Sequence, residues 1–149
     1  MSCPEKKSYR NERKSFENGT SSPSGFLGEC LKKIDELEEK VAAFVATDID
    51  GAKVAARESD KRWKEGKPLS LIDGMPLCIK DIMETASMPT EQGSDLFVGW
   101  RGKRDCAAVA ALREAGAIII AKAVTTEFAA QPARGTRNPW DLSRTPGGS

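Results

Sequence analysis

Residues 106–121 contain the pattern that most constrains the fold: a helical segment, a glycine and an uninterrupted apolar run. Asp105 can cap a helix over residues 106–115, and Gly116 can end it. The next five residues, Ala-Ile-Ile-Ile-Ala at 117–121, have no polar face. A strand that is apolar on both sides is typical of a parallel sheet covered by helices on both faces. The sequence therefore predicts the α/β class.

Other segments supply further elements of such a fold. Residues 26–40 carry apolar side chains at steps of three and four, with charged residues on the other face, which predicts an amphipathic helix. Thr47 and Asp48 offer an N-cap for a second helix over residues 52–64. Residues 76–80 are mostly apolar and are expected to form a buried strand. Glycines, prolines and polar residues in 81–104 predict a long loop.

The N-terminal and C-terminal ends differ in character. Residues 1–24 hold few apolar side chains, so we expect a disordered polar tail there. The elements after it form one continuous unit, which predicts a single domain over residues 25–149. Ser149 directly follows Pro-Gly-Gly at 146–148, a loop sequence that normally joins two packed elements. We therefore expect 25–149 to be the N-terminal portion of a domain that is truncated at its C-terminal end.

Composition narrows the function classes. The formal net charge is +1, so no general attraction to nucleic acid or to a membrane surface is expected. No apolar run approaches the roughly 20 residues that span a bilayer, and no signal-peptide stretch is found, so we expect a cytoplasmic protein. The four cysteines are widely scattered and histidine is absent, which favours neither a disulfide framework nor a metal site. With no nucleotide or flavin motif, the sequence predicts no cofactor and no metal.

Two residues are candidates for chemistry. Lys80 closes an apolar strand, where burial lowers the pKa of a lysine amine and allows it to act as a general base. The alternative is that Lys80 marks the solvent end of the strand, paired with Asp81, and the strand alone favours this interpretation. Ser149 after two glycines could present a hydroxyl, belong to an anion-binding turn, or be an ordinary turn residue. A lysine can activate a serine without an imidazole.

Several sequence blocks occur together in a fixed order and spacing. They are Gly-Met-Pro-Leu-Cys-Ile-Lys-Asp at 74–81, Gly-Ser at 93–94, Arg-Glu-Ala-Gly-Ala-Ile-Ile at 113–119, Lys at 122 leading into Thr-Thr-Glu-Phe-Ala at 125–129, Thr-Arg-Asn-Pro-Trp-Asp at 136–141 and Thr-Pro-Gly-Gly-Ser at 145–149. From about residue 26 to the last residue, the chain resembles the amidase signature family. A series of ordered blocks is far more specific than any one of them.

The resemblance implies a mixed β-sheet covered by helices on both faces, and hydrolysis of small-molecule amides. The family uses a serine nucleophile, a second serine on a cis peptide, and a lysine. Lys80 matches the catalytic lysine, and Ser149 matches the cis-peptide serine that relays the proton. The nucleophile and the oxyanion-hole amides lie downstream in the family, beyond residue 149. The 149-residue chain alone is therefore predicted to be inactive.

The resemblance leaves the substrate class open. Ala121, Ala123 and Val124 depart from the common pattern, and the blocks after them look more like the stand-alone amidases. The alternative within the family is the A (glutaminase) subunit of a tRNA-dependent amidotransferase, which would bring a partner subunit and tRNA. A non-catalytic gene remnant, or an α/β module that binds an anion, is the alternative of another class. Homo-oligomerisation also stays open. For Glu127, a structural hydrogen-bonding role is favoured over a catalytic one.

Overall fold

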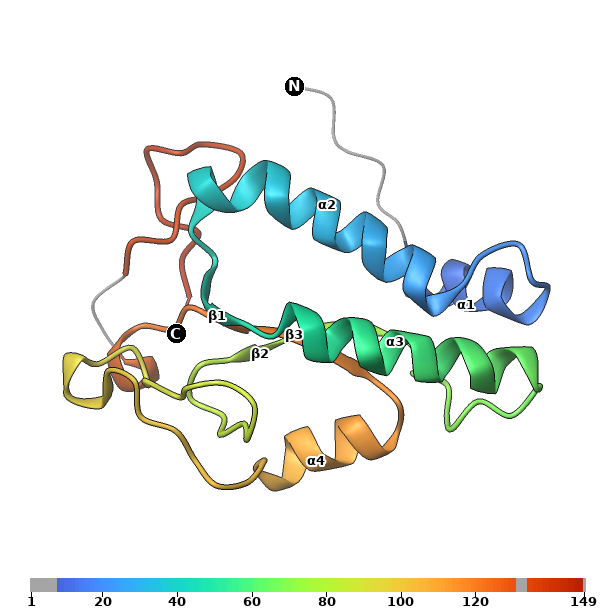
Figure 1. Cartoon of the computed structure of the whole chain (residues 1–149). Coiled ribbons are helices and arrows are strands. Elements are labelled where there is room, and N and C mark those ends of the chain that lie inside the picture. Colours follow the sequence, from blue (N-terminus) through green and yellow to red (C-terminus); the bar gives the residue numbers. More distant parts are fainter. Residues whose placement is uncertain (1–7, 131–133, 149) are drawn as a thin grey trace.

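The computed structural model describes residues 8–130 and 134–148, which form a three-stranded mixed sheet with helices on both faces (Figure 1). The strand order is β1-β3-β2. The described elements are, in chain order, α1 (Tyr9–Glu17), α2 (Pro23–Val41), β1 (Phe44–Thr47), α3 (Ile49–Lys64), β2 (Pro76–Lys80), the 3-10 helix η1 (Asp95–Phe97), α4 (Ala107–Glu114), β3 (Ile118–Ala123) and the 3-10 helix η2 (Glu127–Ala129).

The central strand is β3, and it has a partner on each side. β2 runs parallel to it, with Leu77 opposite Ile119 and Lys80 opposite Ala123. β1 runs antiparallel on the other side, with Thr47 opposite Ala121. Helix α4 lies on the crossover from β2 to β3, the connection that a parallel pair requires. The α/β class with a mixed sheet, predicted from the sequence, is confirmed.

Alternate residues of β3 enter two separate cores. Ile118 and Ile120 pack toward α2 and α3 together with Leu27 and Ala56, while Ile119 packs with Val109 of α4 on the opposite face. Side chains of a strand alternate between its faces, so an apolar run is needed only where both faces are covered. This is the reason that residues 117–121 offer no polar face. Figure 1 shows α2 and α3 on one side of the sheet and α4 on the other.

Local capping contacts fix the two long helices. The Ser22 hydroxyl accepts a hydrogen bond from the Gly25 amide at 3.1 Å at the start of α2. The Asp48 carboxylate accepts one from the Gly51 amide at 3.0 Å, which confirms the predicted cap of α3. No described helix is long and apolar enough to cross a membrane.

The structure differs from the expected disordered tail, because residues 9–17 form helix α1. Phe16 is only 5% exposed and packs edge-on against Trp63, with ring centroids 5.7 Å apart. The Tyr9 hydroxyl donates a hydrogen bond to the carbonyl oxygen of Asp73 at 2.6 Å. A few large aromatic side chains thus bury enough surface to order a segment that is otherwise polar. Residues 1–7 lie outside the described part of the chain.

Candidate functional site

Lys80 is the last residue of β2, and the ladder to β3 fixes its position. The residue after it, Asp81, donates its backbone amide to the carbonyl oxygen of Ala123 at 3.0 Å. The Lys80 side chain is half-buried. Lys80 therefore lies at the carboxyl ends of two parallel strands, which is the edge where open α/β sheets bind ligands.

The loop that follows β2 folds back against this strand end. The Gln92 amide donates to the carbonyl oxygen of Asp81 at 3.0 Å. The Glu91 amide approaches both carboxylate oxygens of Asp81, at 3.3 and 3.2 Å. Thr90 and Ser94 of the same loop are buried. Residues 90–94 are thus fixed beside the position that Lys80 occupies.

A buried ion pair joins the ends of β2 and β3. Lys122 Nζ lies 2.9 Å from Asp81 Oδ1, and both side chains are 0% exposed. The ammonium group also donates to Thr90 Oγ1 at 2.7 Å and to the carbonyl oxygen of Pro89 at 3.0 Å. These three acceptors match the three protons of a lysine ammonium. The Asp81 carboxylate is therefore an ion-pair partner of Lys122, a pairing that the sequence analysis did not consider.

Ser94 connects this loop to the segment after β3. Its hydroxyl donates to Glu127 Oε1 at 2.7 Å, a hydrogen bond of the kind that the sequence analysis favoured for Glu127. Gly93 has a φ of +65°, and a Cβ atom there would lie 2.7 Å from the carbonyl oxygen of Thr125. The Phe128 amide donates to the carbonyl oxygen of Gln92 at 2.9 Å. The two loops therefore pack backbone to backbone, and only glycine fits at position 93.

The segment that leads to Ser149 lies at the same edge. Thr136 Oγ1 donates to the carbonyl oxygen of Ala42 at 2.7 Å, which ties this segment to the end of α2. A small cavity of about 70 Å³ lies between residues 124–126, directly after β3, and residues 145–148. Lys80 and residues 145–148 are thus both adjacent to the end of β3. Ser149 itself lies outside the described residues, so its predicted place beside Lys80 stays a prediction.

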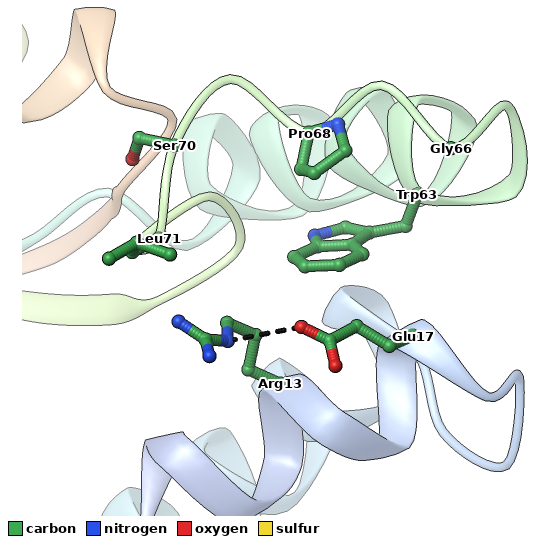
Figure 2. Close-up of a pocket in the computed structure, with 7 residues that line it drawn as sticks. All are labelled: Arg13, Glu17, Trp63, Gly66, Pro68, Ser70 and Leu71. Carbon is green, nitrogen blue, oxygen red and sulfur yellow. Dashed lines mark ion pairs between the residues drawn. The ribbon is translucent and has the colours of Figure 1, made fainter.

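Larger cavities occur away from this edge. One of about 510 Å³ lies between α1 and the loop before β2, where Arg13 and Glu17 form an ion pair of 3.4 Å under Trp63 (Figure 2). Trp63 Nε1 donates to the carbonyl oxygen of Asp73 at 3.1 Å. This cavity lies at the amino end of β2, opposite to the edge where parallel sheets bind ligands. We therefore place the candidate site at the carboxyl ends of β2 and β3.

The sequence and the fold of the chain can be compared with those of known proteins. The family model described as Amidase matches residues 26–149. The chain belongs to the amidase family. Similar curated proteins are glutamyl-tRNA(Gln) amidotransferase A subunits, for example from Salinispora arenicola (39% identical) and Myxococcus xanthus (42%), each over 88% of this chain and 28% of the relative. The chain thus spans somewhat more than a quarter of the length of these amidase relatives.

Solved structures of the family show the same arrangement of elements. The peptide amidase of Stenotrophomonas maltophilia matches with a TM-score of 0.87 and 26% identity, over 95% of this chain and 32% of that protein. A component of a vestigial complex related to an s-triazine catabolic enzyme matches with a TM-score of 0.82 and 25% identity, over 88% of this chain and 30% of that one. The amidase signature fold is therefore the fold of this chain.

Sequence reasoning did not single out the Lys122 and Asp81 pair or the Ser94 to Glu127 hydrogen bond. The sequence does indicate that Lys122 is paired, because this lysine directly follows an apolar run in a strand covered on both faces. A lysine at such a position is almost never buried unless it is paired. Nothing local indicated Asp81 as its partner, because the two residues meet only when β2 and β3 pair. In the described residues, no group of three or more metal-ligating side chains lies together.

Proposed function

We propose that this chain is part of an amide hydrolase in which Lys80 is the general base and Ser149 relays the proton. The observation that carries the proposal is the placement of Lys80 at the carboxyl end of β2, next to the end of β3, where residues 145–148 line a small cavity with residues 124–126. Membership of the amidase family supports the reaction class. The attacking serine would come from a segment after residue 149 in a longer form of the protein.

In the proposed reaction, the neutral amine of Lys80 accepts a proton through Ser149 from the attacking serine. The serine oxygen then forms a bond to the amide carbonyl carbon, and backbone amides stabilise the oxyanion. The relay returns the proton to the leaving nitrogen as the C–N bond breaks. Water hydrolyses the resulting ester and regenerates the serine.

The test uses the longest form of the protein that the coding DNA provides. Lys80→Ala is expected to lower kcat/KM for a linear amide by about 10²–10⁴-fold, since it removes the general base. Lys64→Ala, which alters an exposed lysine on α3, is the matched control and should be unchanged. Undiminished turnover by a folded Lys80→Ala protein would sink the proposal. The 149-residue chain alone is expected to show no turnover.

For the substrate, a linear amide handled by a stand-alone amidase is the first candidate. The structural match to a peptide amidase supports it. Glutamine, handled by an amidotransferase A subunit, is the second candidate, because identities of 39–43% to such subunits exceed the 18–28% found for the solved amidases. Turnover of simple amides by the protein alone favours the first. Glutamine hydrolysis that appears only with a partner subunit favours the second.

A non-catalytic product remains as the alternative of another class. Sequencing the coding DNA past codon 149 separates it from the enzyme. An open frame with a further Gly- and Ser-rich segment supports the hydrolase, whereas a stop codon directly after Ser149 supports a remnant or an anion-binding module.

A further inference from the structure

The buried ion pair between Lys122 and Asp81 carries a large desolvation cost. Both side chains are 0% exposed, and removing two charges from water costs several kcal/mol per ion. Two apolar residues of similar volume would usually give a protein that is as stable or more stable. Stability alone therefore does not account for a lysine in the central strand β3.

The location of the carboxylate suggests another role. Asp81 directly follows Lys80, and four contacts hold it: its ion pair to Lys122, the Glu91 amide on its carboxylate, the Gln92 amide on its carbonyl oxygen, and its own amide on Ala123. A carboxylate that lacks a cation of its own favours the charged form of a nearby amine. Such a carboxylate would work against a neighbouring lysine that must accept a proton.

We propose that Lys122 is a positioning residue for Lys80. By taking the Asp81 carboxylate into a closed ion pair, Lys122 fixes the junction of β2 with the following loop. It also keeps an uncompensated negative charge away from the Lys80 amine. This inference rests on the proposed function of Lys80 as a base, and it assigns to Lys122 no contact with substrate.

The proposal can be separated from a purely mechanical role of the pair. Lys122→Met removes the cation and leaves Asp81 as the only charge of the pair. Lys122→Met combined with Asp81→Asn removes both charges but keeps an oxygen that can accept from the Glu91 amide. If the pair acts by neutralising the carboxylate, the Lys80 amine is less reactive in the single variant and has its wild-type reactivity in the double variant. If the pair only holds the strands together, the reactivity of the Lys80 amine changes by the same amount in both variants.

The readout is the rate at which the Lys80 amine is acetylated by the N-hydroxysuccinimide ester of acetic acid. Only the neutral amine attacks the ester carbonyl, forming an amide and releasing N-hydroxysuccinimide. The rate is measured at one pH by peptide mass spectrometry and divided by that of Lys53 and Lys64, which are exposed on α3. Circular dichroism confirms that each variant is folded.

We expect Lys80 acetylation to be about tenfold slower in Lys122→Met, because an uncompensated carboxylate favours the charged form of the amine and one pKa unit changes the neutral fraction about tenfold. The double variant should return to within about twofold of the wild-type rate. A wild-type rate in folded Lys122→Met, or a double variant as slow as the single one, would overturn the proposal. If Lys122→Met does not fold, it is measured in trimethylamine N-oxide, which favours the compact state. Lys122→Gln is the second variant, with the same expected direction.

This experiment needs no amide turnover. If the Lys80→Ala test fails and the acetylation pattern is as expected, the role of Lys122 stands and the proposed function falls. If the acetylation pattern is absent while Lys80→Ala abolishes turnover, the proposed function stands and the inference about Lys122 falls.

Discussion

Asp73 and Asp81 are both completely buried, at the amino and carboxyl ends of strand β2, but their partners differ. Asp73, before β2, accepts hydrogen bonds from Arg62, Ser59 and the Leu69 amide, and the Arg62 side chain is 26% exposed. Asp81, after β2, is paired with Lys122, which is 0% exposed. The charge at the amino edge is therefore balanced by a group in contact with water, while the charge at the carboxyl edge is balanced inside the protein.

The difference follows from what each carboxylate connects. Asp73 joins α3, the loop before β2 and, through its carbonyl oxygen, α1, so it acts as a structural joint. Burial alone would raise the pKa of Asp73, but the hydrogen bonds from Arg62, Ser59 and Leu69 outweigh it and hold the pKa below its usual range. Asp81 joins the strand end that carries Lys80 to the loop over the candidate site. A buried ion pair at that place fixes the end of β2 and compensates the charge of Asp81.

The largest expected effect is on the enclosed pair. Lys122→Met should lower the free energy of unfolding by about 3–5 kcal/mol, because it leaves an uncompensated buried carboxylate. The double variant Lys122→Met with Asp81→Asn should recover most of this loss. Urea unfolding at neutral pH measures both.

The matched control is Lys61→Met, which breaks the exposed ion pair of 2.7 Å between Lys61 and Glu58. Its cost should stay within about 0.5 kcal/mol. An equally small cost for Lys122→Met would show that burial makes no difference, and the comparison of the two edges would lose its basis.

A smaller loss is expected at the amino edge. Asp73→Asn should cost about 2–3 kcal/mol, because it weakens the bonds to Arg62, whose guanidinium can turn to solvent. The pH dependence has a definite sign. The folded pKa of Asp73 is depressed below the ordinary value of 3.8, so its contribution to stability is present above that value and is lost as the pH falls below it.

Urea unfolding of wild type and Asp73→Asn at neutral pH and in acid measures this contribution. The gap between the two proteins should narrow as the pH falls. A gap that widens in acid would contradict the assigned direction of the Asp73 shift.

The next effect concerns backbone packing at the candidate site. Gly93→Ala and Gly66→Ala introduce the same methyl group at nearly the same φ, +65° and +66°. At position 93 the new Cβ would meet the Thr125 and Thr126 carbonyl oxygens at 2.7 and 2.8 Å, whereas position 66 has nothing within 4 Å. Gly66→Ala should cost about 1 kcal/mol from φ alone, and Gly93→Ala about 1–3 kcal/mol more. Equal midpoints in thermal unfolding would refute the close packing of the two loops.

The sequence predicted those features whose causes are local. β2 has the predicted bounds Pro76–Lys80, and Asp48 caps α3 as expected, because strand pattern and capping depend on neighbouring residues. The predicted cap Asp105 was wrong, since the N-cap of α4 is Cys106. Helix α1 escaped prediction, since it is ordered by aromatic contacts to Phe26 and Trp63 rather than by its own composition. The Lys122 and Asp81 pair escaped as well, because only the pairing of β2 with β3 brings them together. The role of Ser149 stays a prediction.

The smallest expected effect is a change in the titration of Tyr9, which contacts Asp73 at the amino end of β2. Tyr9 is the only tyrosine of the chain, so phenolate absorbance in the near ultraviolet follows this residue alone. Burial, followed by the charge of Asp73, raises the pKa of Tyr9 from 10.0 to about 12. The native protein should therefore titrate near pH 12 and the urea-denatured protein near pH 10. Coincident midpoints would mean that α1 is not docked on the Asp73 network.

The same residue links docking to stability. Because the folded pKa of Tyr9 lies above the unfolded value, its contribution is fully present below pH 10 and is lost as the pH rises toward about 12. Tyr9→Phe removes the 2.6 Å hydrogen bond to the Asp73 carbonyl oxygen but keeps the aromatic ring, so it should cost about 0.5–1.5 kcal/mol at neutral pH. A cost as large as that of Asp73→Asn would instead place the phenol, and not the carboxylate, at the centre of this joint.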